Sequence, residues 1–260
     1  MPPKAIFFVL CDFIQAMAVA TINFAFISAA FIILSSNSCN GLFNCPTEES
    51  QALLSFKTAL NVTDGIFSSW VNGSDCCSMW DGISCNNLTN HVEQVNLSAY
   101  TNHAEQDVQS GVISDLALPS SVRILWLSSI TVSDTLFHNL AELNYLAFSD
   151  CVPNISTTSI PKFQLAALYL SSCSIGGRIP DWLSTQYSLQ GLTLVNDNIV
   201  GEIPSWLWEN NPQLIQLNIS GNHFNGSLII PNRSVPWMTL LDVSRNELTG
   251  QVQSLWPPYC

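Results

Sequence analysis

The chain has 260 residues, and its 7 Lys and Arg residues against 19 Asp and Glu residues give it a net charge of −12. Because phosphate binding needs clustered cations, this balance excludes nucleic acid as a natural partner and argues against docking on anionic lipid headgroups. Only 10% of the residues are charged, where about a quarter is usual in a soluble domain. Regular apolar residues along the chain nevertheless predict a folded core rather than a disordered chain.

The first 38 residues have the features of a targeting segment. After Lys4 an apolar stretch runs over residues 5–34, and its unbroken part, residues 24–34, is shorter than the roughly 20 residues that span a bilayer. A positive start, an apolar stretch and a small polar exit predict a secretory signal peptide over residues 1–38, cleaved near residues 34–40. The alternative is an uncleaved signal anchor. We expect the chain in the secretory pathway and then at the cell surface or in the extracellular space.

Eight Asn-x-Ser/Thr sequons without an intervening Pro agree with export. In a chain rich in Asn and Ser several sequons arise by chance, so the set supports export only because a signal precedes it. The predicted N-glycosylation sites are Asn61, Asn72, Asn87, Asn96, Asn154, Asn218, Asn225 and Asn232.

Four of the nine cysteines lie within 41 residues, namely Cys45, Cys76, Cys77 and Cys85. In an oxidising compartment they predict two disulfides. The adjacent Cys76 and Cys77 are poorly placed to bond each other, which leaves two of the three connectivities. A zinc site is the competing interpretation, but it has neither a Cys-x-x-Cys pair nor nearby His ligands. We expect no metal and no cofactor.

The same segment contains a predicted helix that starts near Thr47. One face of this helix is apolar, and its residues are Ala52, Leu53, Phe56 and Leu60. Trp70 and Trp80, which flank the double cysteine, are expected to pack over the end of a core rather than to stack on a ligand.

This segment resembles a known family. The pattern Cys-x2-Glu-Glu-x2-Ala-Leu-Leu-x-Phe-Lys, then Ser-Trp, then Asp-Cys-Cys-x2-Trp-x-Gly-Ile-x-Cys is similar to the amino-terminal cap of plant extracellular leucine-rich repeat proteins. The residues that carry it are Cys45, Glu48, Glu49, Ala52, Leu53, Leu54, Phe56, Lys57, Ser69, Trp70, Asp75, Cys76, Cys77, Trp80, Gly82, Ile83 and Cys85. The resemblance implies a cap over residues 45–86 with the disulfides Cys45–Cys76 and Cys77–Cys85.

Over residues 92–252 a pattern of apolar residues at positions 0, +3 and +5 recurs about seven times. Residues 165–180 (LAALYLSSCSIGGRIP) and 189–204 (LQGLTLVNDNIVGEIP) align without a gap. Their Gly-x-Ile-Pro ending is similar to the plant class of leucine-rich repeats. The resemblance implies a repeat solenoid, a right-handed superhelix with a parallel β-sheet on its concave face behind the disulfide cap. The repeats start at Val92, Val122, Leu143, Leu165, Leu189, Leu214 and Met238. Residues 253–260 are expected to be an incomplete C-terminal end, since Cys260 has no obvious partner.

An Asn position follows the second strand leucine of each repeat, where a side chain can bond the backbone of the adjacent repeat. It is filled by Cys151, Cys173, Asp197, Asn222 and Asn246. We interpret the two cysteines as small buried residues, with a redox pair or reactive thiol as the alternative. The tryptophans after the Ile-Pro turns are interpreted as structural residues that cover the core from the convex side; they are Trp182, Trp206 and Trp208.

Residues between the strand leucines face outward on the concave side. Trp126, Tyr145 and Tyr169 place bulky aromatic side chains there on three successive repeats, which is typical of a contact patch. The alternative is that they pack against the irregular segment 99–121. The predicted ligand-binding residues are Trp126, Tyr145, Tyr169, Thr193, Gln216 and Asp242. Asn96 and Asn218 lie in the same face, so glycans at both would shield much of it.

Catalysis finds no support in the sequence, because the four His residues are isolated and no hydrolase, metalloprotease, phosphate-loop or kinase motif occurs. We expect a protein that is not an enzyme. The resemblance implies recognition of an extracellular peptide, or of a pathogen- or cell-wall-derived ligand, with signalling through a partner receptor kinase. The acidic charge favours a basic or neutral ligand. Alternatives are a secreted inhibitor of a cell-wall-degrading enzyme, similar to polygalacturonase-inhibiting proteins, and a truncated or decoy receptor fragment.

Overall fold

The computed structural model describes residues 45–60, 65–98, 118–129, 137, 139–150, 161–230 and 238–249. The predicted signal peptide, the C-terminal end at 253–260 and Cys151 lie outside these ranges. So do the sequons Asn61, Asn154 and Asn232 and most of segment 99–121. No helix within these ranges has the length and apolar character that crossing a lipid bilayer requires.

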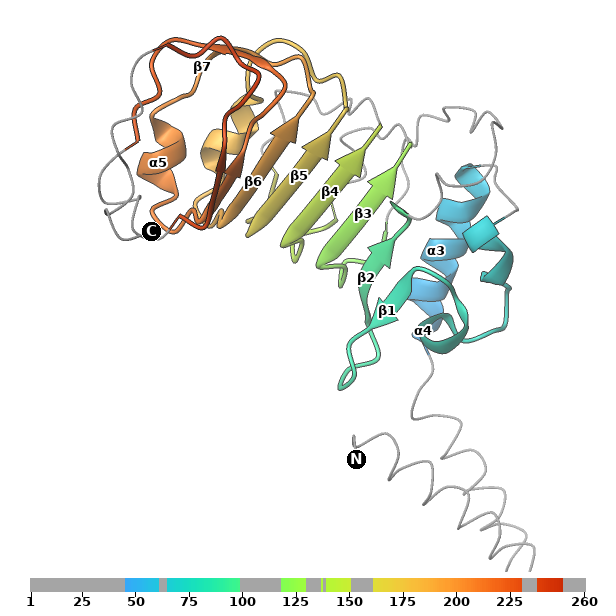
Figure 1. Ribbon diagram of the computed structural model, residues 1–260. Helices are drawn as coiled ribbons and strands as arrows, with labels where there is room; N and C mark the ends of the chain where they lie inside the picture. Colours follow the sequence, from blue (N-terminus) through green and yellow to red (C-terminus); the bar gives the residue numbers. More distant parts are fainter. Residues whose placement is uncertain are drawn as a thin grey trace, which may run out of the picture. The chain divides into compact units, whose positions relative to one another are not determined.

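Short strands separated by turns and short helices make up the described chain (Figure 1). The cap contains α3 (Thr47–Ala59), the 3-10 helix η1 (Gly65–Ser69), α4 (Cys76–Met79) and β1 (Ile83–Cys85). The repeats contain β2 (Val92–Asn96), β3 (Ile124–Ser128), β4 (Tyr145–Ser149), β5 (Ala167–Ser171), the 3-10 helix η4 (Asp181–Thr185), β6 (Gly191–Val195), β7 (Val200–Glu202), α5 (Trp206–Asn210), β8 (Gln216–Asn218), β9 (His223–Asn225) and β10 (Leu240–Asp242).

Helix α3 buries the apolar face that its spacing predicts. Of the four predicted residues, Leu53, Phe56 and Leu60 are buried and Ala52 is partly buried. Pro46 stands at the N-cap of the helix and no side chain caps it. Near the other end Lys57 donates from Nζ to the main-chain carbonyls of Phe67, at 2.6 Å, and Trp70, at 2.9 Å. These two bonds hold η1 against α3.

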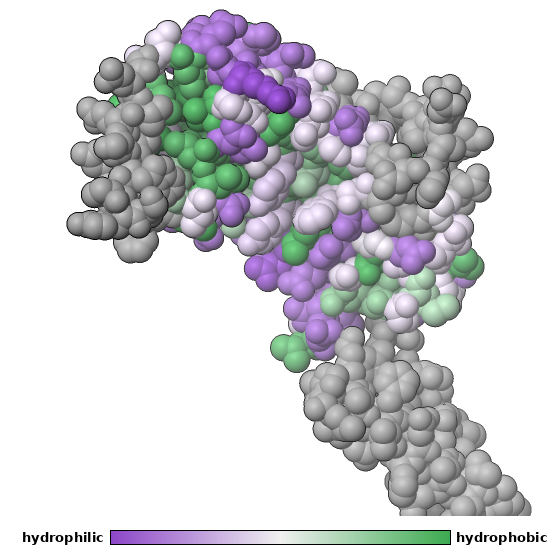
Figure 2. All heavy atoms as spheres, in the orientation of Figure 1, coloured by the Kyte–Doolittle hydropathy of each residue, from purple (hydrophilic) through white to green (hydrophobic). Residues whose placement is uncertain are grey.

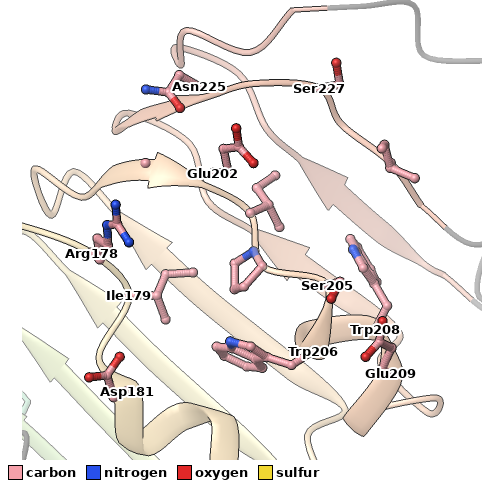
Figure 3. Close-up of a pocket in the computed structure, with 14 residues that line it drawn as sticks. Arg178, Ile179, Asp181, Glu202, Ser205, Trp206, Trp208, Glu209, Asn225 and Ser227 are labelled. Atoms are coloured by element: carbon pink, nitrogen blue, oxygen red, sulfur yellow. The ribbon is translucent and has the colours of Figure 1, made fainter.

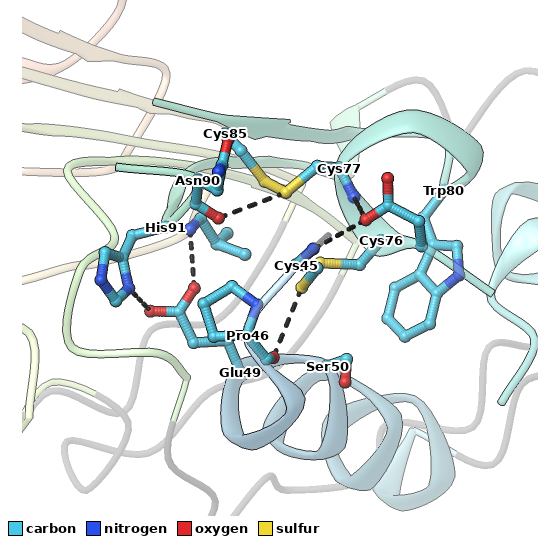
Figure 4. The surroundings of a disulfide bond; sticks show 12 residues. Cys45, Pro46, Glu49, Ser50, Cys76, Cys77, Trp80, Cys85, Asn90 and His91 are labelled. Carbon is cyan, nitrogen blue, oxygen red and sulfur yellow. Dashed lines mark hydrogen bonds and ion pairs between the residues drawn. A yellow bond between two sulfur atoms is a disulfide. The ribbon is translucent and has the colours of Figure 1, made fainter. Parts of the chain in front are cut away.

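Both disulfides that the resemblance implies are present, Cys45–Cys76 and Cys77–Cys85 (Figure 4). The sulfur atoms that a zinc site would use are therefore bonded in pairs. Trp70 and Trp80 are buried beside them and stack with 5.3 Å between ring centroids. The expected packing role of these two tryptophans is confirmed.

Glu49 joins the cap to the repeats. Its Oε1 accepts hydrogen bonds from Nδ1 of His91 and Oγ of Ser121, both at 2.8 Å. Its Oε2 accepts the main-chain N–H of Val92 at 2.7 Å (Figure 4). The Glu49 side chain is only 12% exposed. One carboxylate thus ties helix α3 to the start of the first repeat strand and to the chain that leads into the second.

The repeats form one eight-stranded sheet in the order β1-β2-β3-β4-β5-β6-β8-β10. The pair β1–β2 is antiparallel and every other pair is parallel. The apolar residues that start the repeats are all buried, as the 0, +3, +5 pattern predicts; they are Val92, Val122, Leu143, Leu165, Leu189, Leu214 and Met238. The fold is the predicted parallel-stranded solenoid with a disulfide cap.

The predicted ladder of hydrogen bonds runs through the Asn positions. The main-chain N–H of Cys173 donates to Oδ1 of Asp197 at 2.7 Å, and the N–H of Asp197 donates to Oδ1 of Asn222 at 3.0 Å. From Nδ2, Asn222 donates back to the Leu194 carbonyl at 2.7 Å. Cys173, Asp197 and Asn222 are buried, so these positions are structural.

A second, small sheet pairs β7 with β9 in parallel, and an isolated bridge joins Ser227 to Thr249. Strand β7 contains the repeat glycine Gly201, and β9 ends directly before the repeat glycine Gly226. Trp182 and Trp208 are buried, which confirms their structural role. Trp206 is only partly buried, so a purely structural interpretation of Trp206 is incomplete.

Candidate functional site

The open face is the face of the eight-stranded sheet opposite its buried leucines, and it carries the outward residues of strands β2, β3, β4, β5, β6, β8 and β10. Three of its aromatic side chains are unusually exposed: Trp126 and Tyr145 are each 40% exposed and Tyr169 is 37% exposed. They come from the adjacent strands β3, β4 and β5. Since neighbouring strands lie about 4.8 Å apart, the three rings belong to one continuous surface.

The strand register aligns the outward residues as predicted. Trp126 pairs with Ala147, and Ala147 pairs with Tyr169 on the next strand. Next to Tyr169 stand Ala167 and Gly191; a Cβ on Gly191 would lie 3.5 Å from the Tyr169 hydroxyl. Small neighbours therefore leave the faces of the large rings accessible. This patch is where a ligand could bury apolar surface.

The polar candidates lie on the strands that follow. Thr193 pairs with Asn218, which in turn pairs with Asp242, and all three are partly exposed. Hydrogen bonds from the hydroxyl and main-chain N–H of Ser244 hold the pKa of Asp242 below its ordinary value of 3.8. Asp242 therefore carries a negative charge at neutral pH. Gln216, two residues before Asn218 on strand β8, presents an uncharged amide.

Two sequons of the open face form a local hydrogen-bonded motif. Oδ1 of Asn96 accepts from the main-chain N–H and the hydroxyl of Ser98, at 3.0 and 2.7 Å. Asn218 accepts in the same way from Ser220, at 3.1 and 2.7 Å. Asp242 accepts the N–H of Ser244 at 3.0 Å although it is no sequon. The Asn-x-Ser spacing at these two sites is thus also a structural feature of the repeat. Glycosylation of Asn96 and Asn218 stays a prediction.

A second concave site lies beside the small sheet, and the sequence analysis did not find it. It is a groove of about 890 Å³ whose walls include Arg178, Glu202, Trp206, Asn225 and Ile229 (Figure 3). Figure 2 shows hydrophobic residues gathered at this α5 end of the molecule. The volume falls within the roughly 300–1,000 Å³ of ligand pockets.

A sequence signal for the groove did exist. The variable residue of Gly-x-Ile-Pro recurs at the equivalent sequence position of successive repeats. These residues are Arg178, Glu202 and Ser227, and all three line the groove. Comparing these turn residues between repeats, in addition to the outward strand residues, would have pointed to the site.

The comparisons with known proteins agree with this geometry. Residues 46–86 match the family of leucine rich repeat N-terminal domains. The cap and the repeats of this chain are therefore similar to those of plant leucine-rich repeat proteins. Over 128 residues it is 31% identical to receptor-like protein EIX2 of Solanum lycopersicum, a match that covers 47% of this chain and 12% of that protein. Over 148 residues it is 28% identical to receptor-like protein 7 of Arabidopsis thaliana, covering 53% of this chain and 14% of that protein.

A longer match reaches receptor-like protein EIX1 of Solanum lycopersicum, with 29% identity over 251 residues. It covers 82% of this chain and 22% of the relative. In all three cases the chain spans less than a quarter of the relative's length.

Two solved structures share the fold of this chain. A plant ice-binding protein is 23% identical, with a TM-score of 0.55 over 83% of this chain and 69% of that chain. Pollen receptor kinase 3 is 24% identical, with a TM-score of 0.50 over 77% of this chain and 96% of that chain. At this level of identity the likeness concerns the fold alone.

Proposed function

We propose that this chain is the recognition part of an extracellular receptor-like protein and that its open face binds a ligand through Trp126, Tyr145 and Tyr169. The observation that carries the proposal is the exposure of these three rings on adjacent strands β3, β4 and β5. Exposed tryptophan and tyrosine are enriched among residues that dominate binding energies, because they bury a large area at low entropic cost. The similarity to plant receptor-like proteins supports the same role.

The chemistry of the open face limits the ligand. Its strands offer aromatic rings, amides and hydroxyl groups, and Asp242 is the charged member of the predicted binding set. Such a surface suits an extended ligand that has apolar faces and many hydrogen-bonding groups but little negative charge. A peptide or a neutral cell-wall oligosaccharide has these properties. In this proposal Thr193, Gln216 and Asp242 bind the polar part of the ligand, and a partner receptor kinase carries the signal.

The test uses the full chain, secreted from plant cells, against a defined panel of chitin oligomers, neutral cell-wall oligosaccharides and synthetic secreted peptides. Replacing Trp126 or Tyr169 by Ala should weaken binding of the recognised panel member about tenfold, which corresponds to losing one anchor residue. Tyr187→Ala is the matched control, because Tyr187 is an exposed tyrosine outside the open face. Thermal unfolding of each variant separates a binding residue from a packing residue.

Three results would contradict the proposal: no panel member binds, both open-face variants bind normally, or Trp126→Ala unfolds the chain. Inhibition of a fungal polygalacturonase by the secreted chain would instead support the inhibitor alternative. Co-precipitation of a membrane receptor kinase, dependent on the bound panel member, is the measurement for the signalling partner.

A further inference from the structure

The groove beside the small sheet contains a glycosylation sequon in its own wall. Asn225 and Ser227 of the sequon Asn225-Gly226-Ser227 both line it, and both are exposed. In Figure 3 they lie along one side of the groove, Trp206 and Asp181 lie along the opposite side, and Glu202 lies between them. A glycan attached to Asn225 would start at the wall of the groove.

The sequon is held rigidly against the groove. Gly226 has a φ of +76°, and a Cβ there would lie only 2.9 Å from Cγ of Glu202. The turn is therefore packed on Glu202, which pairs with Asn225 across β7 and β9. On the neighbouring repeat the side chain of Arg178 lies along Gly201, where an added Cβ would be 3.7 Å from Cγ. This packing fixes the position of Asn225 relative to the walls.

The walls match the chemistry of a sugar. A pyranose ring has an apolar face of C–H groups and a rim of hydroxyl and acetamido groups. Trp206 and the 74% exposed Ile229 offer apolar surface for the ring faces. Arg178, Glu202 and Glu209 offer charged hydrogen-bonding groups for the rim, and none of them makes a side-chain hydrogen bond or ion pair with another described residue. Pockets of this composition bind polar ligands that have apolar faces.

We propose that the chain's own N-linked glycan at Asn225 occupies this groove, with its first sugar rings packed on Trp206 and Ile229. Attachment forms a bond between Nδ2 of Asn225 and C1 of the first sugar and breaks the C1–O bond of a lipid pyrophosphate donor. The lipid pyrophosphate leaves and Nδ2 gives up one proton. The glycan then covers apolar surface on this side of the repeats.

The experiment compares glycan release at defined sites of the native, secreted full chain. An endoglycosidase is added, and site-specific mass spectrometry of glycopeptides follows release at Asn225 and at the exposed turn sequons Asn72 and Asn87. We expect release at Asn225 to be about tenfold slower than at the turn sequons and equal to it after denaturation. Trp206→Ala and Ile229→Ser should each accelerate release at Asn225 without changing it at Asn87.

Ile229→Ser keeps the test valid if Trp206→Ala destabilises the fold, because the Ile229 side chain is largely exposed. An unoccupied Asn225, or release at Asn225 as fast as at Asn87, would overturn the proposal. Slow release that neither variant accelerates would also overturn it, because the strand geometry of Asn225, not the groove, would then be protecting the glycan.

Discussion

Replacing Asp197 by Asn should stabilise the protein at neutral pH. Asp197 is fully buried in an Asn position of the ladder, and burial raises the pKa of its carboxyl from 3.8 to about 6. Its Oδ1 accepts from Cys173, but its Oδ2 makes no hydrogen bond to any described residue. In Asn222 the corresponding atom is Nδ2, which donates to the carbonyls of Leu194 and Ile219. Asn at position 197 would restore such a donor.

The shift in pKa gives the magnitude and the pH window. Because the folded-state pKa of Asp197 is raised, the cost of its charge is absent below about pH 4. The cost grows as the pH rises towards 6 and is constant above that. A rise of the pKa from 3.8 to about 6, at about 1.4 kcal/mol per pKa unit, amounts to about 3 kcal/mol. Asp197→Asn should remove this cost and raise Tm by about 5–10 °C at pH 7.

The assay is thermal unfolding of the wild-type protein and the Asp197→Asn variant between pH 4 and pH 7.5. The variant should be more stable at pH 7, and the difference should shrink towards pH 4, where the wild-type carboxyl is protonated. Asp150→Asn is the control, because Asp150 is exposed and should change stability little. A variant that is less stable at pH 7, or a difference that does not depend on pH, would refute the reasoning.

Two further predictions concern the cap. Glu49→Gln should destabilise the protein by about 1–3 kcal/mol. Three donors contact the two carboxylate oxygens of Glu49, whereas the Gln amide has one acceptor oxygen and would turn an N–H group towards at least one of these donors. Equal midpoints of thermal unfolding for the two proteins would contradict this. Cys77→Ser removes the Cys77–Cys85 disulfide, should cost about 2–4 kcal/mol and should lower the amount of secreted chain on an immunoblot of the medium. Secretion at the wild-type level would count against the importance of this disulfide for folding.

Repetition made most of the solenoid predictable. A strand residue alternates between core and surface with period 2, and a repeat places equivalent residues side by side. The pattern alone therefore predicts that Leu146, Leu168 and Leu192 are buried and that Trp126 and Tyr169 face outward. The Cys45–Cys76 disulfide could not be predicted from the pattern alone, because the spacing of the cysteines left two connectivities open. The resemblance to the plant cap indicated which of the two is present.

Side-chain hydrogen bonds could not be predicted in the same way. Glu49 is part of the family pattern of the cap, but its partners His91 and Ser121 lie 42 and 72 residues further along the chain. No local pattern links residues so far apart. Similarly, the Asn-x-Ser sequence of Asn96 suggested a glycosylation site, whereas its contact with Ser98 became visible only in three dimensions.

The two candidate surfaces share a physical cause. Strand leucines such as Leu168 and Leu192 and the ladder residues Cys173, Asp197 and Asn222 are buried between repeats, which constrains their chemistry. The outward strand residues and the variable residue of the Gly-x-Ile-Pro turn are free of that constraint. Trp126 and Tyr169 use the first kind of position, and Arg178 and Glu202 use the second. The buried leucines and the ladder lie between these two kinds of position, so one surface can bind a ligand while the other carries a glycan, and neither requires a change in the core.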